Sequence, residues 1–507
     1  MSAPSNGNET QAAAANAPSS PSTSSIHKSD IEKHSLESID QAEVDKAVKK
    51  MDLVIMPIMT MFYLLSFLDR TNIGNARVAG LQKGLGLTDH QYQICVTVTY
   101  IPYILSELPS NLLLRKIGPN WAMPTILTLW GIIVTFQGFV TSFHGLIAVR
   151  FFIGLVEGPM FPGIVLYLSG FYTRTQISVR VAFFFSAASL SGAFSGLLAA
   201  AISNMHGVGG KQAWSWIFIL EGLFSVLMGV ISFFLVPATP RHSKFLTESQ
   251  KNLIMAQLER DRPFVNPVDT FSFKHIRHAF TSPHVFFMFV VFFVGGTNLF
   301  GLALFSPSII NQLGFSPNHS QLLSVGPFGA AFCMTLFIAY VSDRYRTRAI
   351  PLFSLSIVGI IGYSMYLGTH NKHVAYASIY FMAMGIYGTV PVVAAWISNN
   401  SEPYYTRASA IAICFMATNL GGILSTWSYP TKEGPRFKKT NTMNLIFMIV
   451  TGLLAIANYV VLRYKNNKKA ENRAKVLAPY ITEKEPDGGV TAWVELGDRH
   501  PDFRYAL

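Results

Sequence analysis

Twelve long apolar runs are the feature that most constrains what this chain can fold into. A helix needs about 20 mostly apolar residues to cross a bilayer, and each run reaches that length. Because a backbone inside lipid must satisfy its own hydrogen bonds, the runs predict helices and hence an all-α membrane protein. The predicted spans are residues 53–75, 91–114, 121–141, 145–170, 180–203, 214–236, 284–311, 320–341, 349–368, 374–397, 406–428 and 442–464.

The order of these runs predicts two bundles of six helices, with a polar, charged segment between the sixth and seventh spans. Only 13% of the 507 residues are charged and half are apolar, which excludes a soluble globular chain of this length. The expected organisation is a disordered cytoplasmic N-terminal tail at 1–50, an N-terminal bundle at 51–236, a cytoplasmic central loop at 237–283, a C-terminal bundle at 284–464 and a cytoplasmic C-terminal tail at 465–507.

The basic residues set the expected orientation, because Lys and Arg gather on the cytoplasmic side of membrane helices. They flank both ends of the membrane region, at Lys46, Lys49, Lys50, Arg463, Lys465, Lys468 and Lys469. Both termini are therefore expected in the cytoplasm. One cluster opposes this orientation, namely Lys432, Arg436, Lys438 and Lys439.

Composition and spacing also exclude several classes of function. The formal charge of +12 does not indicate a nucleic-acid partner, because the basic residues flank apolar runs and form no basic face. The cysteines Cys95, Cys333 and Cys414 lie inside apolar runs, and the thirteen histidines include no pair with metal-ligand spacing. We expect no disulfide, metal site or cofactor. No Ser/His or His/Asp grouping indicates an enzyme.

Ionisable side chains inside a span cost several kcal/mol, on the order of 3 on insertion scales, so each one needs a reason. The exceptions here are Asp69, Arg70, Arg150, Glu157 and Glu221, with Glu107 as a weaker sixth. Arg150 and Glu157 are two helical turns apart and project from nearly the same face. Facing an interior cavity, they could hold an anion and a proton. The alternative is a buried ion pair that fixes helix packing.

The remaining polar residues in the spans leave further alternatives open. If the first helix stops at Asp69-Arg70, both are ordinary interfacial charges, whereas a helix that continues to about Ala79 places them against a cavity. Glu107 and Glu221 are expected to be structural, capping a half-helix or pairing with a loop arginine. Asn298 and Asn419 have interhelical hydrogen bonding as their simplest explanation. Small residues along the fifth span predict a close helix contact.

Three segments carry a family resemblance. They are Leu68-Asp69-Arg70-Thr71-Asn72-Ile73-Gly74-Asn75-Ala76, Glu107-Leu-Pro-Ser-Asn-Leu with Arg115-Lys116-Ile-Gly118-Pro119, and Arg150-Phe-Phe-Ile-Gly154-Leu-Val-Glu157-Gly158-Pro-Met-Phe-Pro162-Gly163. Together they resemble the anion:cation symporter family of the major facilitator superfamily, within its fungal allantoate permease branch. Trp216-Ile-Phe-Ile-Leu-Glu221-Gly222 and the closing Asp498-Arg-His-Pro-Asp-Phe-Arg-Tyr505 are most similar to the nicotinate permease group. The resemblance covers about residues 45–507.

The resemblance implies roles for particular residues. Asp69 and Glu157 match the family's proton-accepting carboxylates, Arg70 its substrate-binding arginine, and Arg150 an arginine that assists binding or coupling. We group Asn72, Asn298 and Asn419 with the substrate-binding residues. The cytoplasmic gate or its supporting structure is assigned to Glu107, Arg115, Lys116, Glu221, Asp343, Arg344 and Arg348. The first basic loop lacks the family's usual aspartate, which leaves Glu107 or Glu157 as candidates to replace it.

The sequence thus predicts a proton-coupled symporter of the plasma membrane that imports a small organic anion, such as nicotinate or a related vitamin or carboxylate. Two bundles of six helices suit a transporter that moves its halves about a central site and so opens that site to each side of the membrane in turn. A monomer in a lipid bilayer is expected. Two alternatives remain open, a nutrient sensor on the same fold that does not transport, and an exporter or antiporter of small molecules.

Overall fold

The computed structural model describes residues 41–261, 273–402, 404–430, 433–434, 436–481 and 489–507. Its long helices form two sets. The first set is α2 (Gln41–Val78), α4 (Asp89–Ile117), α5 (Pro119–Gln137), α6 (Phe143–Glu157), α7 (Met160–Ser169), α8 (Arg174–Ile202) and α9 (Ala213–Leu235). The second set is α12 (Pro283–Gln312), α13 (Pro317–Arg344), α14 (Ala349–Gly368), α15 (Lys372–Asn399), α16 (Tyr404–Ser428) and α17 (Lys438–Glu471).

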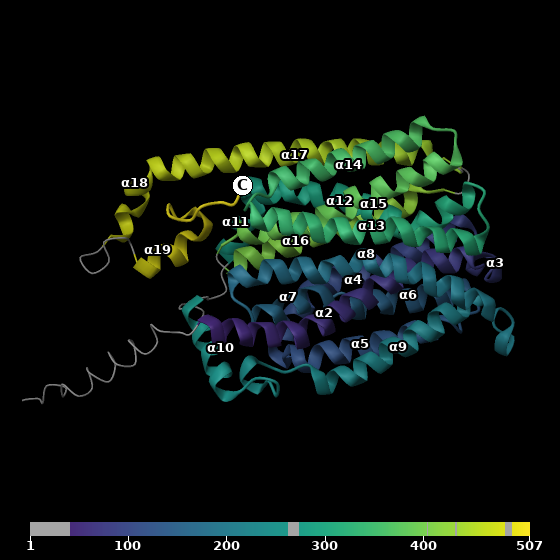
Figure 1. The fold of residues 1–507 in the computed structure, drawn as a ribbon, viewed down its shortest axis with the longest axis horizontal. Coiled ribbons are helices and arrows are strands. Elements are labelled where there is room, and N and C mark those ends of the chain that lie inside the picture. The colour runs from purple at the N-terminus through teal and green to yellow at the C-terminus, as the bar shows by residue number, and fades with distance from the viewer. Residues whose placement is uncertain (1–40, 262–272, 403, 431–432, 435, 482–488) are drawn as a thin grey trace, which may run out of the picture.

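Shorter helices connect these elements and form the tail. They are α3 (Leu81–Gly84), α10 (Glu248–Asp261), α11 (Phe273–Thr281), α18 (Arg473–Leu477) and α19 (Gly489–Leu496), with 3₁₀ turns η1 (Ser203–Met205), η2 (Val208–Gly210), η3 (Pro240–His242), η5 (Ala478–Tyr480) and η6 (Gly497–Arg499). We call the end of the molecule that carries α10, α11, α18 and α19 the linker end, and the opposite end, which carries α3, the far end (Figure 1).

Every predicted span overlaps a long helix, and the fourth overlaps the pair α6 and α7. Among the described residues, nine helices are long and apolar enough to cross a membrane. The other three predicted spans correspond to α4, α5 and the α6–α7 pair. The expected domain boundaries differ from the helices in several places. Helix α17 continues to Glu471, past the expected end of the C-terminal bundle at 464, and α18 and α19 lie in the expected C-terminal tail. Residues 41–50 are helical and belong to α2, and the expected central loop contains α10 and α11.

Proline and glycine shape the fourth span. Pro159, which has no backbone N–H to donate, separates α6 from α7. A Cβ on Gly154 would overlap the backbone of Thr99, and one on Gly158 would overlap the Ser106 side chain. Both neighbours belong to α4, so the glycines allow α6 to lie directly against α4.

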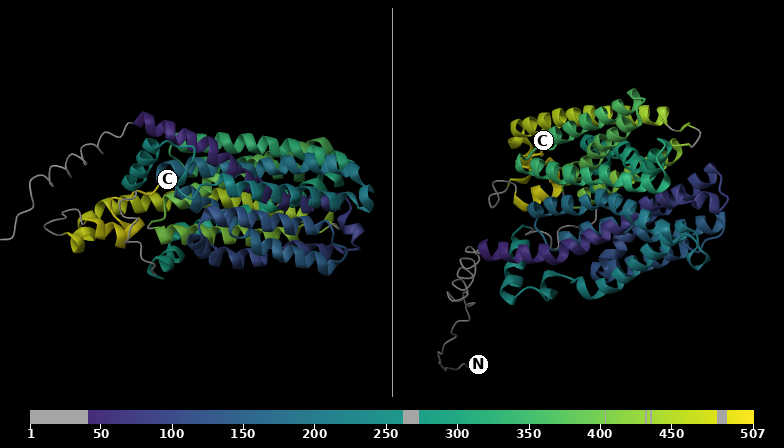
Figure 2. Two further views of the ribbon diagram at one scale, coloured as in Figure 1. Left: turned by 90° about the horizontal axis from the view of Figure 1, so that it is seen from below. Right: turned by 45° about the vertical axis from the view of Figure 1, so that its right-hand side comes forward.

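The two sets of helices form two halves that lie side by side, as the two further views show (Figure 2). In the first half, α5 packs against α9, α2 against α8, and α4 against α6. In the second half, α12 packs against α16, α14 against α15 and α17, and α13 against α15. The halves meet where α8 contacts α13, α2 contacts α12, and α4 contacts α16.

Glycines bring the halves together toward the far end. A Cβ on Gly74 of α2 would overlap the backbone oxygen of Leu304 on α12. A Cβ on Gly196 of α8 would come within 2.6 Å of the backbone oxygen of Gln321 on α13. The small residues predicted to mediate a close contact of the fifth span therefore face α13. Direct backbone approach is possible only without side chains, so these positions form a tight seal.

The C-terminal segment folds back onto the linker end of the second half. The carbonyl oxygen of Ala506 accepts hydrogen bonds from Trp396 Nε1 at 2.9 Å and Asn400 Nδ2 at 3.0 Å, both on or next to α15. Asp498, which is 3% exposed, lies 2.7 Å from His278 Nε2 of α11. The segment thus ties α11 and α15 together at this end.

We predict that Gly74→Ala disfavours closure of the far end, because the new Cβ overlaps backbone that cannot move independently. Overpacking of this kind costs about 1–3 kcal/mol, and 1.4 kcal/mol changes an equilibrium about tenfold. In a Gln321→Cys background, reaction of the buried thiol with a maleimide should become at least about fivefold faster. Gly329→Ala is the matched control, since its Cβ would meet open space. Equal rates in both variants would contradict a seal at Gly74.

Candidate substrate cavity and its ionisable residues

A cavity lies between the two halves, with about 780 Å³ of empty space, open space included. The first half contributes side chains from α2, α4, α7 and α8, and the second half from α12, α15, α16 and α17. Most of the walls are aromatic or aliphatic. Arg70 is the one residue with a charged side chain among the described lining residues.

Arg70 is held by an ion pair inside this cavity. Its Nε donates to Glu157 Oε1 at 2.7 Å, and the Ser66 hydroxyl donates to the same oxygen at 2.6 Å. The Glu157 side chain is 1% exposed and that of Arg70 is 13% exposed. Because α2 continues as a helix to Val78, Asp69 and Arg70 lie inside the helix, and the alternative of interfacial charges at its end is wrong.

Aromatic rings surround the Arg70 guanidinium. It lies 4.6 Å from the ring centre of Tyr103, 5.5 Å from that of Phe67 and 5.6 Å from that of Phe300. Contacts of this kind stabilise a cation that has been removed from water. The guanidinium is therefore fixed in place, with its charge balanced by Glu157.

Two asparagines from the second half add polar groups to the cavity wall. Asn298 Oδ1 accepts from the Tyr363 hydroxyl at 3.3 Å, and Asn419 Nδ2 donates to the Phe415 carbonyl at 3.2 Å. The interhelical hydrogen bond expected for Asn298 is present, whereas the bond of Asn419 stays within α16. Asn298 Nδ2 and Asn419 Oδ1 have no hydrogen-bond partner among the described residues. One donor and one acceptor thus remain for a bound molecule.

Aromatic side chains close the cavity toward the linker end. The rings of Phe161 on α7 and Phe415 on α16 have centres 4.1 Å apart. The ring centre of Phe185 on α8 lies 5.3 Å from that of Phe161, and the ring centre of Phe292 on α12 lies 5.3 Å from that of Phe415. Toward the far end, the ring centres of Phe300 and Tyr100 lie 5.3 Å apart. Both exits from the cavity therefore pass between aromatic rings from opposite halves.

Arg150 and Asp69 lie outside the cavity lining, in the interior of the first half. Arg150 is 4% exposed, and its guanidinium lies 5.9 Å from the Phe218 ring on α9. Asp69 is 5% exposed and close enough to Arg150 for the two charges to interact. The pairing considered for Arg150 and Glu157 is not observed, because Glu157 bonds to Arg70.

The other predicted residues are distributed over the molecule. Asn72 is buried and accepts from the Ser195 hydroxyl at 2.6 Å, which joins α2 to α8 away from the cavity. Glu107 and Glu221 are buried within α4 and α9, and no hydrogen bond is formed by Glu107 Oε2 or by either Glu221 carboxyl oxygen among the described residues. Neither a helix cap nor a pair with a loop arginine is formed by Glu221 among the described residues.

The predicted cytoplasmic gate is only partly described. In the second half, Asp343 forms an ion pair with Arg348 at 2.6 Å, while Arg344 is exposed. The side chains of Arg115 and Lys116 lie outside the described part of the chain. Glu157 is bonded to Arg70, so it does not replace the aspartate missing from the first basic loop.

Sequence reasoning missed the side chains that hold Arg70. Ser66 lies one helical turn before Arg70, so the spacing of polar residues in the first span could have identified it. Tyr103, Phe300 and Phe415 gave no comparable signal, because aromatic residues occur throughout the spans. Only the packing of separate helices selects these rings from the rest.

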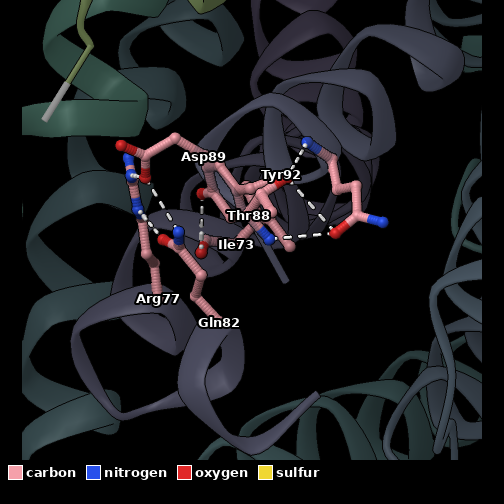
Figure 3. Close-up of polar contacts among 7 residues, drawn as sticks. Ile73, Arg77, Gln82, Thr88, Asp89 and Tyr92 are labelled. Atoms are coloured by element: carbon pink, nitrogen blue, oxygen red, sulfur yellow. Dashed lines mark hydrogen bonds and ion pairs between the residues drawn. The ribbon is translucent and has the colours of Figure 1, made fainter. Parts of the chain in front are cut away.

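A second, wider hollow of about 1690 Å³, open space included, lies at the far end between the halves. Its rim contains a fixed polar network (Figure 3). Arg77 donates to Gln82 at 2.8 Å and to Asp89 at 2.9 Å, and its guanidinium lies 4.4 Å from the Tyr92 ring. The Tyr92 hydroxyl donates to the Ile73 carbonyl at 3.2 Å. These contacts fix the connection from α2 to α4.

We predict that Arg70→Met and Glu157→Gln each destabilise the protein, because each leaves a buried group without its partner. Breaking one side of a buried pair costs about 3–5 kcal/mol. The double variant should lose less stability than the sum of the losses in the two single variants, because neither charge then remains buried without its partner. Thermal unfolding of the four purified proteins measures this coupling. Strictly additive losses would show that the two side chains do not interact.

Known proteins provide an independent comparison. Residues 59–426 match the family described as Major Facilitator Superfamily. A protein of Schizosaccharomyces pombe named as an uncharacterized transporter is 34% identical over 498 residues, covering 95% of this chain and 97% of that protein. The high-affinity nicotinic acid transporter of Saccharomyces cerevisiae is 31% identical over 464 residues, covering 91% of this chain and 84% of the relative.

Solved structures share the arrangement of helices. The proton:xylose symporter XylE bound to 6-bromo-6-deoxy-D-glucose aligns with a TM-score of 0.63 at 14% identity, over 81% of this chain and 95% of that chain. A bacterial homologue of the human lysosomal transporter Spinster, in an inward-facing and unoccupied conformation, aligns with a TM-score of 0.61 at 14% identity. The alignment covers 80% of this chain and 96% of that chain. At such identities these structures support the fold alone, and the predicted fold is confirmed.

Proposed function

Because this chain belongs to the Major Facilitator Superfamily and is one of its multi-pass membrane transporters rather than an enzyme, we propose that it is a proton-coupled symporter importing a small organic carboxylate. The observation that carries this proposal is the position of Arg70. A guanidinium that lines a closed cavity between two halves is suited to bind a carboxylate. We assign the chain to the anion:cation symporters and their fungal allantoate permease branch.

The walls of the cavity favour a flat, aromatic monocarboxylate such as nicotinate. Phe67, Tyr103 and Phe300 surround Arg70 and offer ring faces next to it. Asn298 and Asn419 offer one free donor and one free acceptor for a ring nitrogen or another polar group. The name of the Saccharomyces cerevisiae relative supports this choice.

Competition for one guanidinium explains how a proton would be coupled to the substrate. The Glu157 carboxylate occupies Arg70, and a substrate carboxylate needs the same cation. A proton on Glu157 neutralises it and releases Arg70 for the substrate. Loss of that proton restores the ion pair and expels the anion. Asp69 is a further proton-accepting position in this proposal, and Arg150 balances the charge of its carboxylate once the proton has left.

The proposed cycle moves the two halves about the cavity in a monomer. The aromatic contacts of Phe415 with Phe161 would separate to release substrate toward the linker end. The glycine seal at Gly74 would separate to admit substrate at the far end. We propose that the linker end, with both termini, faces the cytoplasm and that the protein resides in the plasma membrane.

We predict that Arg70→Ala abolishes uptake of radiolabelled nicotinate by permease-deficient fungal cells. Removing one partner of a buried charged contact costs about 2–5 kcal/mol of binding, or at least about 25-fold in affinity. Arg70→Lys should retain partial uptake, because it keeps the charge and loses the planar fork. The exposed Arg463 provides the control Arg463→Ala, with surface amounts matched by fluorescence. Wild-type protein that accumulates no labelled carboxylate would favour the sensor alternative.

We predict that Glu157→Gln removes the dependence of uptake on external pH. Wild-type uptake should rise as the medium becomes mildly acidic, because the proposed cycle carries a proton inward with each substrate. Glutamine is permanently neutral, so the variant should exchange substrate equally well at each pH and should not concentrate it. Counterflow and net uptake in vesicles, with and without a protonophore, separate these activities. If the variant accumulates substrate to the same concentration as the wild-type protein, the coupling proton binds to a residue other than Glu157.

A further inference from the structure

Three ionisable side chains lie together in the first half, apart from the cavity. They are Asp69 on α2, Arg150 on α6 and Glu221 on α9, which we call the buried triad. None is more than 5% exposed, and none lines the cavity. The competition between Glu157 and substrate for Arg70 makes no use of Glu221.

The three residues lie at one depth in the bundle. Helix α2 ends at the far end at Val78, nine residues after Asp69 (78 − 69). Helix α6 begins there at Phe143, seven residues before Arg150 (150 − 143). Helix α9 begins there at Ala213, eight residues before Glu221 (221 − 213). At about 1.5 Å per residue, all three are about 10–14 Å along their helices from the far end. Their side chains can therefore meet across the interior of the first half.

Electrostatic interactions among the three side chains agree with this common depth. Asp69 lies close enough to Arg150 and to Glu221 for the charges to interact. Arg150 lies over the ring of Phe218, which is three residues before Glu221 and shares its face of α9. Asp69 is thus the member that both of the others reach.

No other described charge balances the triad. Helix α5, which packs against α9, has no charged residue, and Glu221 is the sole charged residue of α9. Arg180 of α8 is paired with Asp52, and Glu157, which also acts on Asp69, is paired with Arg70. Both carboxyl oxygens of Asp69 and of Glu221, and Nε and Nη2 of Arg150, have no hydrogen-bond partner among the described residues.

The charge count of the triad requires one extra proton. Two ionised carboxylates and one guanidinium leave a net negative charge in a buried site, which is costly. We propose that Asp69 and Glu221 share a single exchangeable proton beside Arg150, which makes Glu221 a proton-binding residue of the transport cycle. This inference rests on the proposed proton coupling and adds to it a second proton position that does not contact substrate.

The triad is adjacent to the rim of the far-end hollow. Tyr92 has the Arg77 guanidinium stacked on its ring (Figure 3), and its hydroxyl group lies within electrostatic reach of Arg150. Tyr92 is therefore the side chain shared by the rim network and the triad. Movement of the α2–α4 connection when the far end opens would give water access to the shared proton.

The test counts protonated carboxylic acids in the purified full-length chain, reconstituted in phosphatidylcholine vesicles without substrate. Infrared difference spectra over a pH titration report each buried acid by its carbonyl band. If one proton is shared, Glu221→Gln and Asp69→Asn should each remove the same band, because each variant leaves one carboxylate to match the single guanidinium of the triad. The double variant should lose nothing further. Arg150→Gln should add a second band.

Two controls make the outcome decisive. Glu107→Gln removes another buried carboxyl group and should leave the shared band unchanged. Glu221→Asp keeps an acid at the site and should retain the band at a shifted position, which covers the case in which Glu221→Gln does not fold. The inference is overturned if Glu221→Gln titrates like the wild-type protein, if the two single variants remove two different bands, or if Glu221→Asp leaves the band unmoved.

Failure of the proposed function would be distinguishable from failure of this inference. Reversal-potential measurements with nicotinate in the same vesicles give the protons moved per substrate, and Glu221→Gln should lower that number by one. Absence of nicotinate transport together with a shared band would reject the substrate and retain the triad. Proton-driven nicotinate uptake that depends on Arg70, together with unchanged bands in Glu221→Gln, would retain the transporter and reject the triad.

Discussion

The need to balance buried charge in a low-dielectric interior governs this molecule. A guanidinium in the cavity wall requires an anion, and Glu157 supplies it at 2.7 Å from Arg70. The same need explains why aromatic faces surround the cation, since they offer partial negative charge without a carboxylate. In the proposed cycle a substrate carboxylate competes with Glu157 for Arg70, so one ion pair both stabilises the buried cation and responds to the substrate.

Close packing within and between the halves complements this arrangement. Within the first half, Gly154 and Gly158 bring α6 against α4, which positions Glu157 beside α2. Between the halves, contact depends on glycines at the far end and on aromatic rings such as Phe161 and Phe415 at the cavity. Neither type of contact, as described, contains a charge pair, so separating the halves there breaks no salt bridge.

Part of the site was accessible to sequence reasoning. Asp69, Arg70, Arg150, Glu157 and Glu221 stood out because charges inside apolar runs are costly wherever the helices pack. Their partners did not follow from that argument. The two turns between Arg150 and Glu157 indicated one shared face, yet the two residues serve different surroundings, because α6 lies between the cavity and the interior of the first half.

The sequence by itself determined the helices, the two-halved fold and the set of buried charges, because the length and polarity of each run act locally along the chain. The tertiary structure alone decided that Glu157 bonds to Arg70, 87 residues away, and that Arg150 and Glu221 lie within electrostatic reach of Asp69. It also decided which aromatic rings line the cavity. These choices depend on how helices rotate and pack against each other, and no local pattern encodes a distance between helices that are remote in sequence.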